Sequence, residues 1–193
     1  MKKGQFVVEP GIAISSFVEK INKLSYKNFP PEDVLTALQK DMVPFELLDP
    51  YIFFSDARYT RNLIHKTDGF EVVLMCWNPG QKSPVKNLMG TLTWFGVERG
   101  MLDISYFQEE PSSGSNSKLK KLNLVRLKQG SVEFPSRVYS FENNSDSQVV
   151  SLHLFVPPSS QCEIYDIELG TKRTVPLSYH SIHGKLVAPE DKR

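Results

Sequence analysis

Two residues early in the β-rich part of the chain have the types and spacing to bind a small acid. Tyr59 and Arg61 are two positions apart, so in a β-strand both side chains project from the same face of the sheet. A guanidinium is a planar fork of donors that matches a carboxylate. A structural ion pair is the other interpretation of Arg61, and the sequence leaves both open.

A lysine follows the turn around which the apolar middle of the chain is organised. Residues 72–77 are apolar and lead into a Pro-Gly turn, after which Lys86 and Leu88 share one face of a strand. If Lys86 points inward, its ammonium needs a partner or a lowered pKa. It could then form an anion pocket with Arg61, form a hydrogen bond with Tyr139, or act as a base or Schiff-base amine. If Lys86 extends along its stem to solvent, it has none of these roles.

The histidines and cysteines do not form a recognisable metal motif. The histidines are His65, His153, His180 and His183. His180 and His183 are three apart, but no carboxylate shares helical or strand register with them, so no new metal site is predicted. The two cysteines, Cys76 and Cys162, are far apart and could in principle form a disulfide. Two reduced thiols in a cytoplasmic protein are the simpler expectation.

The composition excludes some classes of partner. The chain has 193 residues, with 23 Lys and Arg against 22 Asp and Glu, and the net charge of +1 gives no field that favours nucleic acid or a membrane. No apolar run approaches the roughly 20 residues that span a bilayer, and the N-terminus lacks a signal-peptide core. We expect a monomer with a single domain over residues 1–193, helical over 1–48 and a β-barrel over 49–187.

The hydrophobic pattern changes period along the chain. Apolar residues at 14, 17, 18, 21 and 24 predict a helix over 12–24, and Pro31 begins a second helix that runs from Glu32 to about Asp41. From Tyr51 onward, short strands alternate with turn signals every 8–12 residues, and residues 111–117 are a Gly- and Ser-rich loop. This succession is typical of a β-sandwich or β-barrel.

Several short motifs occur in one order between about Pro31 and Gly184. They are Tyr-Thr-Arg-Asn at 59–62, Cys-Trp at 76–77, Pro-Gly at 79–80, Ser-Pro at 83–84, Glu-Asn at 142–143, Ser-Leu-His-Leu at 151–154, Pro-Pro at 157–158, Cys162 and His-Ser at 180–181. In this order and spacing they resemble the cysteine dioxygenase type I (thiol dioxygenase) family of cupins. The resemblance implies a mainly β, cupin-like (jelly-roll) small β-barrel with two or three N-terminal helices.

The same resemblance exposes a missing metal site. Members of the family hold one non-haem iron(II) with three histidines, two after the Ser-Pro and one three residues before the Glu-Asn. Here those positions are Lys86, Leu88 and Tyr139. Leucine cannot coordinate, an ammonium repels a cation, and a lone tyrosine is a poor iron(II) site. We therefore predict no metal and no other cofactor, although iron(II) would be the family's cofactor.

A second family motif is also altered. The Ser-x-His-x-Tyr run, which aims a tyrosine hydroxyl at iron-bound substrate in the family, is Ser151, His153 and Phe155 here. Without the hydroxyl, His153 is expected to be a hydrogen-bonded core histidine. The thioether crosslink of some members needs a cysteine at Thr93 and a tyrosine at Phe155, so it cannot form.

These observations predict a cysteine dioxygenase-like protein that is catalytically inactive and binds a small thiol or carboxylate. By resemblance, Arg61 would pair with the ligand's carboxylate, Tyr59 would lie beside it, and Lys86 would add its charge. The alternative is a working oxidoreductase of the family with an atypical or non-iron site. No nucleic-acid or membrane partner is expected.

Overall fold

The computed structural model describes residues 10–40, 43–110, 118–135 and 138–188, so the loop predicted at 111–117 lies outside the described residues. The chain begins with helices α1 (Pro10–Ser25) and α2 (Pro31–Lys40) and the 3-10 helix η1 (Phe45–Tyr51). Pro31 followed by two acidic residues explains why α2 begins there, since acidic side chains stabilise a helix N-terminus. None of the helices in the described part of the chain is long and apolar enough to cross a membrane.

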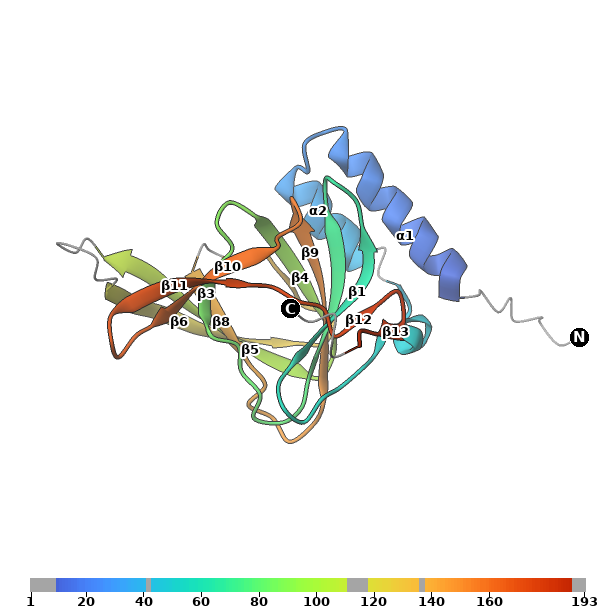
Figure 1. Ribbon diagram of the computed structural model, residues 1–193. Helices are drawn as coiled ribbons and strands as arrows, with labels where there is room; N and C mark the ends of the chain where they lie inside the picture. The colour runs from blue at the N-terminus through green and yellow to red at the C-terminus, as the bar shows by residue number, and fades with distance from the viewer. Residues whose placement is uncertain (1–9, 41–42, 111–117, 136–137, 189–193) are drawn as a thin grey trace, which may run out of the picture.

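The strands form two sheets that curl against each other (Figure 1). The seven-stranded sheet has the order β13-β12-β1-β2-β9-β4-β7. Its strands are β1 (Thr60–Lys66), β2 (Glu71–Trp77), β4 (Leu92–Arg99), β7 (Val132–Glu133), β9 (Val149–Val156), β12 (Ser181–Ile182) and β13 (Lys185–Leu186). The six-stranded sheet has the order β11-β10-β3-β8-β5-β6. Its strands are β3 (Val85–Asn87), β5 (Met101–Glu110), β6 (Lys118–Lys128), β8 (Val138–Glu142), β10 (Gln161–Asp166) and β11 (Thr171–Pro176).

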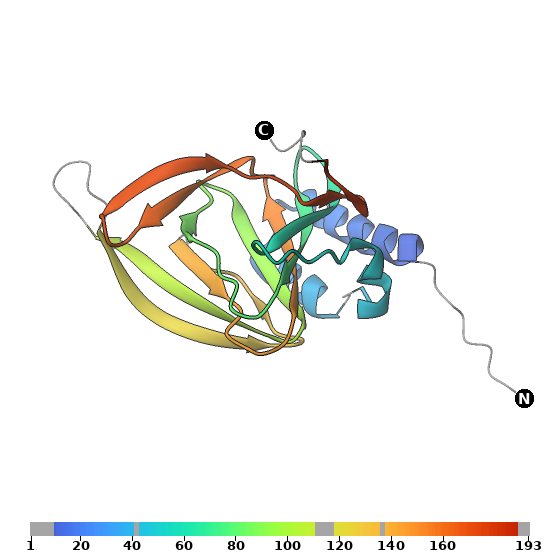
Figure 2. The same cartoon turned by 60° about the horizontal axis from the view of Figure 1, so that its bottom comes forward.

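This architecture confirms the predicted mainly β, cupin-like jelly roll with N-terminal helices. In Figure 2, the β10–β11 hairpin and the β5–β6 hairpin lie on opposite sides of the barrel interior. Strand β2 is buried along its whole length because both of its faces are covered, which explains its continuous apolar sequence.

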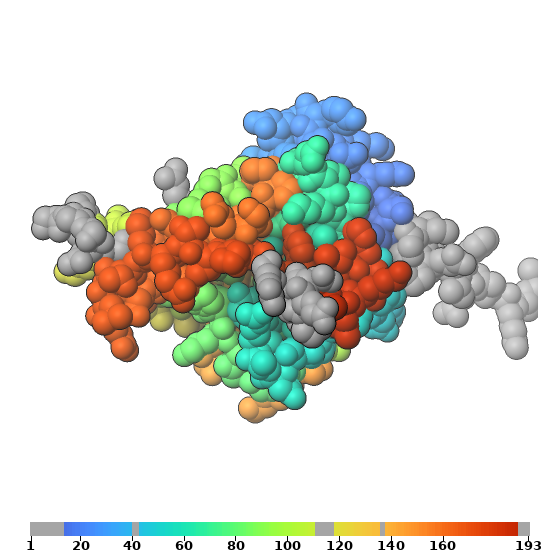
Figure 3. Space-filling view, viewed as in Figure 1, coloured from blue at the N-terminus to red at the C-terminus, as the bar shows by residue number. Residues whose placement is uncertain are grey.

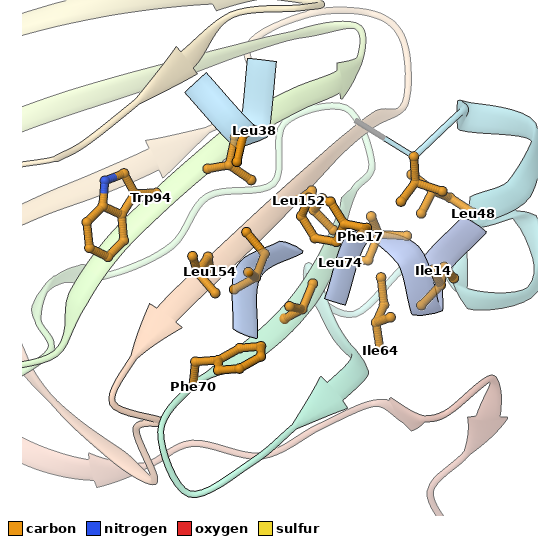
Figure 4. Close-up of a cluster of buried hydrophobic side chains, with 14 of the residues drawn as sticks. Ile14, Phe17, Leu38, Leu48, Ile64, Phe70, Leu74, Trp94, Leu152 and Leu154 are labelled. Atoms are coloured by element: carbon orange, nitrogen blue, oxygen red, sulfur yellow. The ribbon is translucent and has the colours of Figure 1, made fainter. Parts of the chain in front are cut away.

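The two faces of the seven-stranded sheet contribute to separate hydrophobic cores. Leu74 on β2 and Leu152 and Leu154 on β9 pack against Phe17 of α1 and Leu38 of α2, as Figure 4 shows. A second set of buried side chains points into the barrel from the opposite faces of the same strands. It includes Val73, Met75, Trp77, Phe95 and Phe155. The helices thus close the outer face of the sheet and leave the barrel interior to the ligand-binding candidates.

The short strands at the C-terminal end were not predicted from the sequence. Strand β12 pairs in parallel with β1, with Asn62 opposite Ser181. The Ser181 hydroxyl donates to Asn62 Oδ1 at 2.8 Å, and the backbone N–H of His180 donates to the carbonyl of Arg61 at 2.7 Å. A two-residue strand is too short to show a period. This pairing holds the segment before β12 beside β1.

Candidate functional site

A cavity of about 530 Å³ lies between β1, β3, β10, β11 and the segment that precedes β12. Figure 3 views the face on which β10, β11 and the C-terminal segment (orange to red) meet the residues before β1 (teal). All three residues predicted to bind a ligand, Tyr59, Arg61 and Lys86, line this cavity. Two exposed cations, Arg58 and Lys82, also line it. No Asp or Glu is among the described residues that line it, so the Lys and Arg charges of the cavity wall are not balanced by an acidic residue of the wall.

Lys86 points into the barrel. Its strand, β3, lies between β8 and β10, which places Lys86 opposite Tyr139 on one side and Ile164 on the other. The lysine is 4% exposed, and its Nζ lies 5.5 Å from the ring centroid of Phe141 and 5.7 Å from those of Tyr59 and Tyr139. The interpretation in which Lys86 reaches solvent is therefore wrong. Pairing on both edges of β3 fixes which face of the strand is inside.

The surroundings of Lys86 weaken its charge. Within the described part of the chain, Nζ has no carboxylate and no hydrogen-bond acceptor in contact, and the hydrogen bond that Tyr139 could have formed with it is absent. Burial, and then the Arg61 charge, lower the pKa of Lys86 to about 8, while Cys162 opposes the shift. The faces of aromatic rings attract a cation, but they replace only part of the lost hydration.

Arg61 lines the cavity and also forms a buried ion pair. Its Nη2 donates to Glu71 Oε1 at 3.1 Å, and the Glu71 side chain is fully buried. The Tyr179 hydroxyl donates to the other Glu71 oxygen, which Lys66 Nζ approaches to 3.9 Å. The guanidinium carbon lies 5.3 Å from the Phe155 ring centroid, and Nε has no partner. Glu71 therefore holds Arg61 in place while leaving part of its fork unused.

Ser151 and His153 form a buried chain of hydrogen bonds with Trp77. Trp77 Nε1 donates to Ser151 Oγ at 3.0 Å, and Ser151 Oγ lies 2.8 Å from His153 Nε2. The His153 ring is fully buried and stacks on Phe95 and Phe155 at centroid distances of 5.2 and 5.8 Å. Burial, followed by the charges of Lys86 and Arg61, keeps the pKa of His153 well below its usual value, so the ring is neutral. The prediction of a hydrogen-bonded core histidine is confirmed.

The residues at the family's metal-ligand positions do not fit iron(II). Leu88 is 5% exposed and belongs to the apolar core of the barrel, and the Tyr139 hydroxyl is buried without a hydrogen-bond partner. Lys86, the third residue at these positions, is a buried cation. Across the described residues, no three His, Cys, Asp or Glu side chains come together in a way that could hold a metal ion. The donor set offers one phenol oxygen and one amine, not the imidazoles and carboxylates that iron(II) takes in such sites.

Several buried polar atoms on the barrel side have no partner. They are Arg61 Nε, Thr93 Oγ1, Tyr139 Oη and His153 Nδ1. A buried polar atom left unpaired costs about 1–3 kcal/mol, and in proteins such atoms usually meet water or a ligand. A second cavity, of about 730 Å³, is lined by Leu88, Thr93 and Tyr139. Of the residues with unpartnered atoms, Arg61 shares the first cavity with Lys86, whereas Thr93 and Tyr139 line the second.

Both cysteines are free and buried, as expected for reduced thiols. Cys162 lines the cavity, where burial raises the pKa of its thiol and the nearby Lys86 and Arg61 charges oppose that rise. Cys76 faces the helices, and burial raises the pKa of its thiol to about 11.

Sequence reasoning missed two residues of the site, Glu71 and Tyr179. Arg61 lies opposite Met75 in the β1–β2 ladder, so strand register does not predict the contact between Arg61 and Glu71. Tyr179 precedes β12 in a stretch without regular period. The only usable signal was Glu71 itself, an acidic residue at the start of a continuous apolar run.

Comparison with known proteins agrees with the motifs. The family model described as cysteine dioxygenase type I matches residues 37–168, which is more than half of the chain. Cysteine dioxygenase type 1 of Homo sapiens is 30% identical over 139 residues, covering 69% of this chain and 68% of that protein. The Danio rerio protein of the same name is 26% identical over 151 residues, covering 76% and 72%. A double-stranded β-helix protein from Klebsiella pneumoniae superposes with a TM-score of 0.45 at 15% identity, covering 68% of this chain and 94% of that one.

Proposed function

The chain belongs to the cysteine dioxygenase type I family, and from that premise we propose that it binds a small anionic ligand in its barrel and does not carry out iron-dependent thiol oxidation. The observation that carries this proposal is the burial of Lys86, without a counter-ion among the described residues, at a position where the family has an iron ligand. A cation at that place opposes metal binding and favours an anion.

The charges around the cavity support an acidic ligand. Lys86 and Arg61 lie within it, and Arg58 and Lys82 lie at exposed positions of its lining. Arg61 is paired with Glu71, but its Nε is left without a partner. At an effective dielectric constant of about 20, a carboxylate about 4 Å from a cation gains about 4 kcal/mol. The cavity, at about 530 Å³, has the volume of a small-molecule site. Small carboxylates, including those that carry a thiol, are therefore the ligand class we propose.

Metal analysis and oxygen uptake test the inactive part of the proposal. We expect the purified protein to contain far less than one iron per chain and to consume no oxygen with cysteine, even after incubation with iron(II). One iron per chain together with cysteine-dependent oxygen uptake would overturn the proposal in favour of a working oxidoreductase with an atypical site.

Thermal shift and calorimetry with small carboxylates and thiols test the binding part. We expect saturable stabilisation by at least one carboxylate, weaker in Arg58→Gln and in Lys86→Met than in the wild type. Lys128 is exposed on β6 and is not among the residues that line the cavity, so Lys128→Met is a matched control that should behave as the wild type does. Binding that is equal in all four proteins would contradict a role for this cavity.

A further inference from the structure

We propose that Lys86 forms a reversible imine with a small α-oxo carboxylate held in the cavity. This inference rests on the proposed anion site and adds a covalent step to it. The step depends on Lys86 itself, a residue that departs from the family's motif.

The first support is the free-amine character of Lys86. Only an uncharged amine is a nucleophile. Burial disfavours the ammonium form, no carboxylate of the described residues pairs with it, and attraction to three aromatic rings offsets only part of the lost hydration. The Arg61 charge acts in the same direction, and with burial it brings the pKa of Lys86 to about 8. Roughly one lysine in ten is then uncharged at pH 7, compared with fewer than about one in a thousand for an ordinary lysine.

The second support is access. Nζ is buried by protein atoms, yet Lys86 lines the cavity of about 530 Å³. Lys172, by contrast, lies at the surface between Glu109 at 3.3 Å and Glu163 at 3.4 Å, and those partners raise the pKa of Lys172 against the effect of burial. Lys86 is thus distinguished from a surface lysine by both environment and position.

The charge pattern selects the carbonyl compound. In an α-oxo acid the carboxylate is bonded directly to the carbonyl carbon, so the amine and its anion-binding partner must be neighbours. Arg61 is close enough to Lys86 to lower its pKa, lines the same cavity, and has an unpartnered Nε. A simple aldehyde has no group for Arg61 to hold. We therefore assign the site to an α-oxo carboxylate.

The chemistry balances without an oxidant or a reductant. The Lys86 nitrogen attacks the carbonyl carbon to give a carbinolamine. The carbon–oxygen bond then breaks, and both hydrogens of the amine leave with the oxygen as water, which gives the neutral imine. The Tyr139 hydroxyl lies opposite Lys86 in the β3–β8 ladder and has no partner. Burial raises the pKa of Tyr139, so its hydroxyl stays protonated, but Tyr139 lines the second cavity and is not among the described residues that line the first, so the step assigns it no role.

Reductive trapping tests this step. The protein is incubated with pyruvate at pH 8, sodium borohydride is added, and the modified lysines are located by peptide mass mapping. We expect one reduced pyruvate adduct at Lys86, with labelling of Lys86 at least about tenfold above that of Lys172. Labelling by acetaldehyde under the same conditions should be weaker. Lys86→Met should abolish the specific adduct, while the exposed control Lys128→Met should keep it.

The outcomes separate this inference from the anion site. Binding of pyruvate by calorimetry without an adduct at Lys86 would overturn the imine and leave the anion site standing. Adducts spread evenly over surface lysines would overturn it as well. Absence of both binding and adduct would overturn the imine and count against the anion site. Because the mapping is done on the wild type, the result does not depend on how a variant folds.

Discussion

Replacing Lys86 by methionine should make the protein more stable. Methionine keeps an unbranched, flexible side chain of similar length and removes the charge. Burial and Arg61 lower the pKa of Lys86 from its ordinary 10.5 to about 8. At about 1.4 kcal/mol for each tenfold change in proton affinity, holding the ammonium in the fold costs roughly 3 kcal/mol. Attraction to three rings at 5.5–5.7 Å offsets about 1–2 kcal/mol of this cost. The expected net gain at pH 7 is about 1–2 kcal/mol.

The gain has a pH dependence with a definite sign. The folded protein releases the Lys86 proton near pH 8, whereas the unfolded chain keeps it until about pH 10.5. Between these values the unfolded state binds more protons, so the stability of the wild type rises with pH. The penalty is complete below about pH 8 and disappears by about pH 10.5. The advantage of Lys86→Met should therefore be full at pH 7 and shrink as the pH rises through this range.

Urea unfolding followed by the fluorescence of Trp77 and Trp94, both fully buried, measures this effect. Wild type and Lys86→Met are compared at pH 7 and at pH 10, and the exposed control Lys128→Met should differ from wild type by less than about 0.5 kcal/mol. A variant that is less stable than wild type at pH 7, or a stability difference that does not change with pH, would refute the reasoning.

Three further predictions concern other buried polar groups. Burial raises the pKa of Glu98 from 4.5 to about 8, so the wild type loses stability as the pH rises through this range. Glu98→Gln should therefore be more stable than the wild type by about 5 kcal/mol at pH 9, and by much less at pH 5, in urea unfolding. Glu71→Gln removes the charge that pairs with the buried Arg61 and should cost about 3–5 kcal/mol in the same assay; an unchanged midpoint would argue against the ion pair. Ser181→Ala removes the hydrogen bond to Asn62 and should lower the unfolding free energy by about 1–2 kcal/mol. A calorimetric melting curve that matches that of the wild type would contradict a stabilising contact between β12 and β1.

The sequence predicted those parts of the fold that depend on local pattern. The helical period of residues 14–24 and the proline with two acidic residues at 31–33 are local signals, and both helices are present. The apolar run of β2 and the turns that follow it also read correctly. Strands β12 and β13 were missed because each is two residues long, and it is pairing with β1 that makes β12 a strand. Their position depends on long-range contacts such as Asn62 with Ser181.

The site was predictable only as far as the alternation of side chains between the two faces of a strand allows. This alternation places Lys86 and Leu88 on the same face of β3, but it does not say whether that face points into the barrel or out of it. The pairing of β3 with a neighbouring strand on both edges decides this. The contact of Arg61 with Glu71 has no such rule, since it crosses the β1–β2 ladder out of register. Charge networks of this kind depend on side-chain direction in three dimensions, which an alternating pattern does not encode.

The energetics of the barrel interior bear on why Lys86 is present at all. A barrel interior that binds no ligand is most stable when its side chains are apolar, as Leu88 and Phe155 are here. Lys86 runs against this rule, and so do the unpartnered atoms of Thr93, Tyr139 and Arg61 near it. Each lowers the stability of the empty barrel, and an anion or a carbonyl compound in the cavity that Lys86 and Arg61 both line would satisfy those two residues. A variant such as Lys86→Met that gains stability and loses ligand binding together would tie that cost to function.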